Sequence, residues 1–232
     1  MNRFDSFKQF YLGNASISTY KRYLCFVLLY YFILITIAQI SYPGGYSLFE
    51  NTISDMGGLR NNPEVWWVYS IGGSFVGILL IPIFIFHRNN AAKIEKTLAN
   101  LYILFSIIGS LSFSLVCAIP QDFGTPHDVF ADLAFGGLGL GVLLSLVIQL
   151  KCYQKNDGNY RKNWLFLIYS PLFIIGILQA IFQNIKFDEQ IVDPKWTDWP
   201  IWQWTLMLSV LWAIFSYTLS EKKINGELAF IF

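Results

Sequence analysis

Charged residues are scarce in this sequence. Only 13% of the 232 residues are charged, whereas 55% are hydrophobic, and the mean hydropathy is +0.47. Ordinary soluble domains carry about 25% charged residues. Because a chain with so little charge cannot hide all of its apolar side chains in a water-soluble core, the composition predicts an integral membrane protein.

Cysteine and histidine are also rare. Cys25, Cys117 and Cys152 are scattered and form no C-x-x-C pair, which argues against a disulfide framework or a zinc site. The net charge is +1 and no basic patch is visible, so we expect no nucleic-acid partner. The sequence contains no Ser-His-Asp order, nucleophile elbow, phosphate-binding loop or dinucleotide fingerprint. No cofactor is therefore evident, and the partners we expect are membrane lipids.

Long hydrophobic runs are plentiful. A membrane-spanning helix needs about 20 apolar residues, and the windows that qualify are Tyr23–Ser41, Val65–Phe86, Leu98–Ile119, Val129–Leu150, Trp164–Ile185 and Ile201–Leu219. Since the linkers are short, we expect an all-α fold, a six-helix membrane bundle that forms a single domain over residues 23–219. Residues 1–22 are either a helix on the membrane surface or a flexible tail, and residues 220–232 form a C-terminal tail.

Basic residues predict the orientation of this bundle. Thirteen Lys and Arg residues fall in the two terminal segments and the 87–97 and 151–163 loops, whereas Arg60, Lys186 and Lys195 lie on the other side. Lys and Arg are concentrated in cytoplasmic loops. Both termini are therefore expected in the cytoplasm, with the protein in the plasma or cytoplasmic membrane.

Acidic and amide side chains gather at the outer ends of the spans. Asp132 would lie roughly 9 Å along the fourth helix, with Asp128 one turn above it on the same face. A carboxylate at that depth is a functional candidate, unless it reaches the water at the headgroups. Gln179 and Gln183 form a pair in the fifth span. These residues predict an outward-opening polar cavity, and the alternative is that they only hold the helices together through hydrogen bonds.

His127 begins the pattern His-Asp-x-x-x-Asp. On a helix it would point about 100° away from Asp128 and about 140° away from Asp132, so Asp55 or Asp122 would have to complete a metal site. Three interpretations remain open. His127, Asp128 and Asp132 could bind a divalent cation, His127 could be a general base or an orienting donor, or it could simply begin a helix.

Two further patterns concern helix ends and helix packing. The other histidine, His87, stands beside Arg88 at a span end and is expected at the membrane interface. The spacings Gly73-x-x-x-Gly77 and Gly137-x-x-x-Gly141 are typical of closely packed membrane helices.

Two motifs together resemble a known family. Residues 51–58, Asn-Thr-Ile-Ser-Asp-Met-Gly-Gly, follow the first span, and residues 119–122, Ile-Pro-Gln-Asp, lead to Pro-His-Asp at 126–128. The pair looks like the six-span family called domain of unknown function 998, which is similar in turn to the Frag/DRAM/Sfk-like membrane proteins. Met56 stands where the family pattern has Leu. The resemblance implies a six-span fold and marks Ser54, Asp55 and His127 for testing, but it implies no settled activity.

The sequence therefore predicts a site on the outer side of the membrane. Candidate ligand-binding residues are Asn51, Ser54, Asp55, Asp122, His127, Asp132, Gln179 and Gln183, and candidate catalytic residues are Asp55, His127, Asp128 and Asp132. The expected function is to bind or process a lipid headgroup or a small polar ligand. The alternatives are an ion- or proton-coupled transporter with Asp132 as its relay, and a structural or assembly protein without a ligand.

Overall fold

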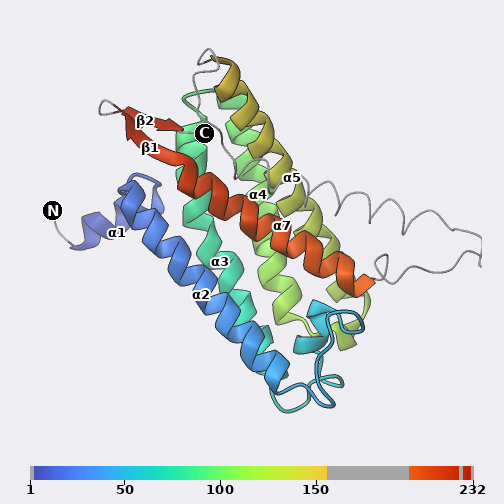
Figure 1. Cartoon of the computed structure of the whole chain (residues 1–232). Coiled ribbons are helices and arrows are strands. Elements are labelled where there is room, and N and C mark those ends of the chain that lie inside the picture. The colour runs from blue at the N-terminus through green and yellow to red at the C-terminus, as the bar shows by residue number, and fades with distance from the viewer. Residues whose placement is uncertain (1–2, 156–198, 225–226, 231–232) are drawn as a thin grey trace, which may run out of the picture.

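The structure is a computed structural model that describes residues 3–155, 199–224 and 227–230 (Figure 1). In chain order, its elements are the helices α1 (Arg3–Tyr11), α2 (Ile17–Ile40), η1 (Ile53–Gly57, 3-10), α3 (Trp66–Ala91), α4 (Lys96–Ala118), η2 (Gln121–Phe123, 3-10), α5 (Thr125–Lys155) and α7 (Trp199–Ser220), followed by the strands β1 (Glu221–Ile224) and β2 (Glu227–Phe230). The two strands pair antiparallel. The described chain is thus helical apart from one short hairpin near its C-terminus.

Among the residues that the structure describes, four helices are long and apolar enough to cross a membrane: α2, α3, α4 and the Thr125–Lys151 part of α5. They coincide with the first four predicted spans, so the prediction of a multi-pass helical membrane protein is consistent with the structure. Helix α7 is 22 residues long and covers the predicted sixth window. The predicted fifth window, 164–185, lies outside the described residues.

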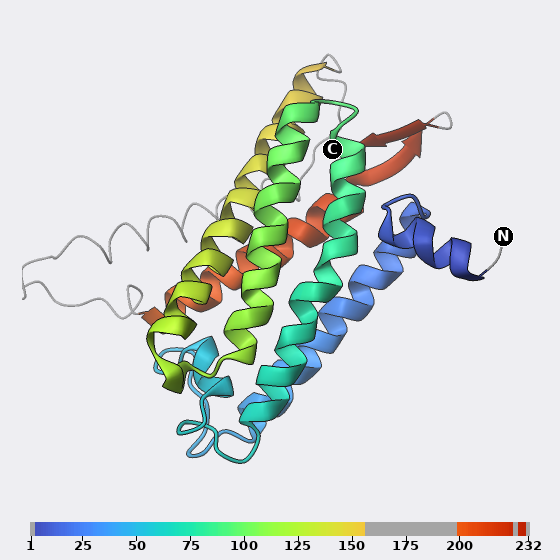
Figure 2. The same cartoon turned by 180° about the vertical axis from the view of Figure 1, so that it is seen from behind.

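The helices form a bundle in which α4 packs between α3 and α5, as Figure 2 shows from behind. Helix α2 packs against α3, and α7 crosses the bundle obliquely and contacts α5 and α2 (Figure 1). The largest fully buried side chains include Tyr31, Ile83 and Phe84. Met207, Val210 and Ile214 of α7 are buried in the same cluster, so apolar burial holds α7 against the other helices.

Glycine allows α4 and α5 to approach closely. A Cβ atom added at Gly137 would lie 2.6 Å from the backbone nitrogen of Gly109, far closer than real Cβ contacts. At Gly141 the added atom would lie 2.7 Å from Ser106 Oγ, and at Gly73 it would lie 2.8 Å from Cys117 Sγ. The predicted packing role of the two glycine pairs is therefore confirmed at these contacts.

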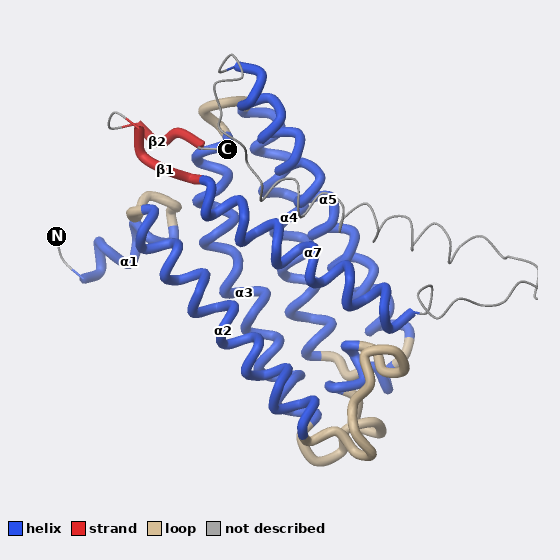
Figure 3. Tube along the Cα trace, in the orientation of Figure 1, coloured by secondary structure: helices blue, strands red, loops and turns tan. Residues whose placement is uncertain are grey.

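The connecting segments gather at the two ends of the bundle. The α2–α3 connection, which contains η1, meets the α4–α5 turn, which contains η2, at one end (Figure 3). Helix α1 and the β1–β2 hairpin lie at the other end (Figure 1). Helix α2 begins earlier than the predicted Tyr23, because Ser16 caps its first turn by accepting a hydrogen bond from the Thr19 backbone N–H at 3.2 Å.

Candidate functional site

Two loops that are distant in the sequence meet through side chains at one end of the bundle. His127, at the start of α5, lies 3.0 Å from the Ser54 hydroxyl in η1 through its Nε2 atom. Gln121, in η2, donates to Asp55 Oδ1 at 2.6 Å. The structure therefore brings together the two sequence motifs on which the family resemblance rests.

Asp55 organises the loop that carries Ser54. Its Oδ2 atom accepts from the Thr52 backbone N–H at 2.7 Å, while the Thr52 hydroxyl accepts from the Asp55 backbone N–H at 3.2 Å. This reciprocal pair is a capping box, which fixes the start of the 3-10 helix. Oδ1 also accepts from Asn61 at 2.8 Å, in addition to Gln121. Both carboxylate oxygens are thus engaged in holding the loop and the Gln121 amide in place.

Asp122 makes the second link between the loops. Its Oδ2 atom accepts from the Leu59 backbone N–H at 2.5 Å, and its Oδ1 atom lies 3.5 Å from the Arg60 guanidinium. The Arg60 side chain is 89% exposed, so this ion pair contributes little to stability by itself. The backbone hydrogen bond is the more informative contact, because it fixes where the chain leaves η1.

Asn51 also has a structural role in the loop. Its Oδ1 atom accepts from the Ser47 backbone N–H at 2.9 Å, and its amide donates to the Tyr42 hydroxyl at 3.2 Å. The Tyr46 hydroxyl donates to the Thr52 carbonyl at 2.8 Å and accepts from Trp204 at 3.1 Å. Burial raises the pKa of Tyr46 above its usual value, so this phenol remains a neutral donor. The loop is thereby attached to α7.

A small cavity lies beneath the contact between Ser54 and His127. It is lined by Ser54, Gly57, Tyr69, Ser70, Val116, Cys117, Pro120, Gln121 and His127. The sequence did not identify Tyr69, Ser70, Cys117 or Gln121 as site residues. Gln121 could have been found, since it belongs to the Ile-Pro-Gln-Asp motif, but the other three carry no local signal and reach the cavity through the packing of α3 against α4.

The two carboxylates that follow His127 lie elsewhere. The side chains of Asp128 and Asp132 are exposed on α5 and do not line the cavity, whereas His127 is only 7% exposed. Gln179 and Gln183 lie outside the described residues. Among residues 3–155, 199–224 and 227–230, no three His, Cys, Asp or Glu side chains are grouped so that they could hold a metal ion.

The expectation that His87 lies at the membrane interface is wrong. Its side chain is fully buried among α3, α4 and α7, where Nδ1 lies 3.1 Å from the Tyr102 hydroxyl and Nε2 lies 2.9 Å from the Thr218 hydroxyl. Thr218 already donates to the Ile214 carbonyl at 2.7 Å. Thr218 must therefore accept from Nε2–H, which leaves Nδ1 to accept from Tyr102.

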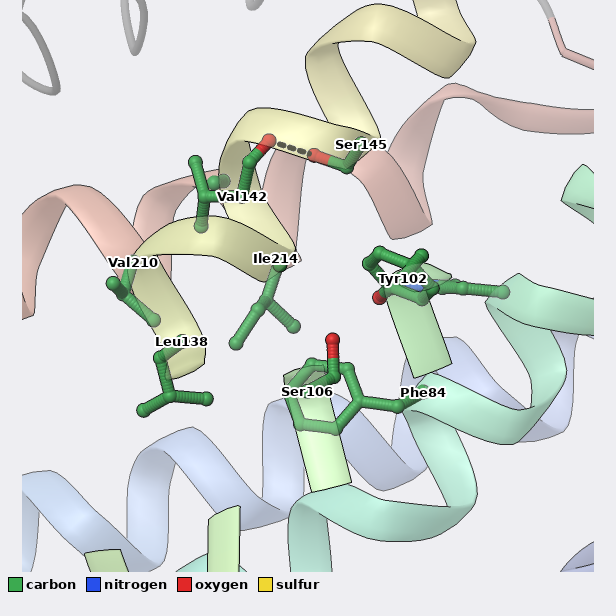
Figure 4. Close-up of a pocket in the computed structure, with 11 residues that line it drawn as sticks. Phe84, Tyr102, Ser106, Leu138, Val142, Ser145, Val210 and Ile214 are labelled. Carbon is green, nitrogen blue, oxygen red and sulfur yellow. Dashed lines mark hydrogen bonds between the residues drawn. The ribbon is translucent and has the colours of Figure 1, made fainter. Parts of the chain in front are cut away.

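His87 lines a second small cavity between α3, α4, α5 and α7 (Figure 4). Figure 4 shows apolar side chains such as Leu138, Val210 and Ile214 around it, with the hydroxyls of Ser106 and Ser145 among them. Ser145 donates to the carbonyl of Val142 in its own helix at 2.7 Å. Because His87, Tyr102 and Ser145 each have a hydrogen-bond partner within the bundle, we assign this cavity a packing role.

The chain matches no protein-family model, and neither a curated protein nor a solved structure matches it.

Proposed function

We propose that this membrane protein uses the cavity beneath Ser54 and His127 to bind an uncharged polar group, either the glycerol and ester region of a membrane lipid or a small soluble molecule with the same chemistry. The observation that carries the proposal is the meeting of Ser54, Gln121 and His127 in the wall of one cavity. Binding sites are typically apolar hollows with a few converging polar groups, and here a buried imidazole, a hydroxyl and an amide converge in one cavity wall.

The absence of basic side chains from the cavity wall limits the class of ligand that it can bind. None of its described lining residues is Lys or Arg, and the nearest guanidinium, that of Arg60, extends into solvent. Phosphate groups are usually bound by Arg or Lys. A ligand hydroxyl can donate to Ser54 Oγ and an ester oxygen can accept from the Gln121 amide, and Val116 and Pro120 offer apolar contacts for the adjoining carbon atoms.

The proposal includes six spans, cytoplasmic termini and a location in the plasma or cytoplasmic membrane. The distribution of Lys and Arg supports this orientation, as does the placement of α1 and the hairpin at the end of the bundle opposite η1. In a variant without its three cysteines, Glu50→Cys should react with a membrane-impermeant maleimide on intact cells, and Lys93→Cys only after permeabilisation. The reverse pattern would place the cavity on the cytoplasmic side.

We further propose membership of the family called domain of unknown function 998. The support is that its two motifs, which are separated by about two spans in the sequence, contact each other through Ser54 and His127. The contact gives a physical reason why both motifs should occur in one protein.

Ligand binding can be tested by thermal unfolding of the purified full-length protein in detergent. The probes are dioctanoylglycerol, for the lipid source, and monoacetin, for the soluble source. A ligand at 100 times its Kd stabilises a folded protein by about 2.7 kcal/mol, so a saturable rise in Tm is expected with at least one probe. Stabilisation by dioctanoylglycerol alone would identify the lipid.

The matched variants are His127→Ala, which removes a cavity side chain, and Glu64→Gln, which changes an exposed residue outside the cavity. His127→Ala should abolish the probe-dependent rise in Tm, and Glu64→Gln should retain it. If neither probe stabilises the wild-type protein, or if His127→Ala responds like the wild type, the cavity is not the binding site.

A further inference from the structure

The hydrogen bonds of His127 determine which of its nitrogens carries the proton. Nδ1 lies 2.6 Å from the Ile119 carbonyl oxygen, which can only accept, so Nδ1 must be protonated. In the neutral ring, Nε2 then has a lone pair, and the Ser54 hydroxyl donates to it at 3.0 Å. The imidazole is therefore oriented to take a proton from Ser54.

The group that orients His127 is itself fixed. Ile119 is the C-cap residue that follows α4, and its backbone N–H donates to the Leu115 carbonyl at 2.9 Å. Serine becomes a nucleophile when an adjacent base, held by a third group, can accept its proton. Here the backbone carbonyl of Ile119 takes the place of the carboxylate that orients the histidine in many serine hydrolases. The sequence gives no sign of this, because it contains none of the usual motifs.

The cavity contains a donor for a developing negative charge. The Gln121 amide has two N–H groups, and one of them donates to Asp55 Oδ1 at 2.6 Å. The other has no partner among the described residues and belongs to a side chain in the cavity wall. A donor that is already held in place stabilises an oxyanion without reorganisation. Asp55 thus acts as a positioning residue for Gln121.

We propose that Ser54 and His127 form a nucleophile and base pair that cleaves a carboxylic ester, with acyl esters of membrane lipids as the substrate class. This inference rests on the proposed binding function of the same cavity. Ser54 Oγ attacks the ester carbonyl carbon, and its proton moves to His127 Nε2. The bond to the alcohol oxygen breaks, that oxygen takes the proton from Nε2, and the acyl group remains on Ser54.

Water completes the reaction. It attacks the acyl carbon while one of its protons moves to His127 Nε2. The bond between the acyl carbon and Ser54 Oγ then breaks, Oγ takes the proton from Nε2, and a carboxylic acid is released. No oxidant, reductant or metal ion is needed, and Ser54 and His127 return to their initial states.

The test is covalent labelling of the purified full-length protein in detergent with a short-chain and a long-chain alkyl fluorophosphonate. Ser54 Oγ would displace fluoride from phosphorus, and peptide mass spectrometry would locate the label. We expect labelling of Ser54 in the wild type, none at this position in Ser54→Ala, and a rate reduced by about 10²–10⁴-fold in His127→Gln, the range for loss of a general base. Ser41→Ala, at an exposed hydroxyl outside the cavity, is the matched control and should label like the wild type.

A second measurement covers the case in which His127→Gln fails to fold. In the variant without its native cysteines, Ser54→Cys should be alkylated by iodoacetamide faster than an exposed cysteine at position 41. An equal or lower rate at position 54 would overturn the role of His127 as a base.

The results separate the two proposals. If neither fluorophosphonate labels Ser54 of the folded wild type while dioctanoylglycerol or monoacetin still raises its Tm, the esterase proposal is overturned and the binding proposal stands. If labelling and stabilisation are both absent, both proposals fail. Labelling of Ser54 in the wild type, with none at this position in Ser54→Ala, would support the esterase proposal.

Discussion

Gln121 donates a hydrogen bond of 2.6 Å to Asp55 and so joins the turn after α4 to the 3-10 helix that precedes α3. The same carboxylate accepts from the backbone of Thr52 and the amide of Asn61. One acidic side chain therefore holds two loops in register, and Ser54 and His127 meet because these loops are fixed.

Asp55→Asn should destabilise the protein. Whichever position the new amide nitrogen takes, it faces a donor, because Oδ2 accepts from Thr52 and Oδ1 accepts from Asn61 and Gln121. We expect the free energy of unfolding to fall by about 1–3 kcal/mol, measured by reversible unfolding in mixed micelles. The control Glu50→Gln neutralises an exposed acid in the same loop and should leave stability unchanged. Equal stability of the two variants would contradict the organising role of Asp55.

Asn62→Ala should also lower the free energy of unfolding. The amide of Asn62 is fully buried and donates to the Ala38 and Met56 carbonyls, both at 3.2 Å. Ala38 lies in the last turn of α2, where carbonyls have no partner within the helix. Leaving these carbonyls unpaired should cost about 1–3 kcal/mol in the same unfolding assay. Glu64→Ala, at an exposed site nearby, is the control. If the two variants have the same free energy of unfolding within error, Asn62 does not cap α2.

Two adjacent glycines on α5 should respond differently to the same substitution. In Gly137→Ala the new Cβ would lie 2.6 Å from Gly109 N and 2.7 Å from Gly109 Cα, which are backbone atoms that cannot rotate away. The cost of such overpacking is about 1–3 kcal/mol. In Gly136→Ala nothing lies within 4 Å of the new atom, so stability should not fall. Thermal melting of the two variants side by side is the measurement, and a Gly137→Ala variant as stable as Gly136→Ala would refute the close approach.

His87 and Tyr102 should be energetically coupled through their 3.1 Å contact. In a double-mutant cycle with His87→Leu and Tyr102→Phe, residues in contact show interaction energies of about 0.5–3 kcal/mol. Tyr102→Phe combined with Tyr46→Phe, at the opposite end of the bundle, should be additive. Additivity in both cycles would argue that the buried histidine does not depend on Tyr102.

Much of the helical framework could be predicted from the sequence, because membrane-spanning helices are specified by local hydropathy. The windows starting at Tyr23, Val65, Leu98 and Val129 each coincide with a long apolar helix. The glycine spacing predicted close packing, but the sequence alone could not tell that Gly137 meets Gly109 on α4. Such a contact depends on the relative rotation of two helices, which hydropathy does not fix.

The candidate site was only partly predictable. The sequence identified Ser54, Asp55 and His127 as candidates. It also predicted that the His127 side chain points away from those of the two acids that follow it on the helix. It did not indicate which of these side chains faces the bundle. The structure turns His127 inward and leaves Asp128 and Asp132 exposed, so the proposed cavity contains an imidazole and a hydroxyl rather than a row of carboxylates.

The sequence by itself determined that this chain favours membrane-spanning helices, because hydrophobic runs of that length have no stable place in water. Only the tertiary structure decided how its few polar groups are paired. The partner of Ser54 is 73 residues away, and that of His87 in α7 is 131 residues away. Hydrogen bonds of such long range depend on helix packing, and that packing links a serine, a histidine and a backbone carbonyl by hydrogen bonds beside a cavity.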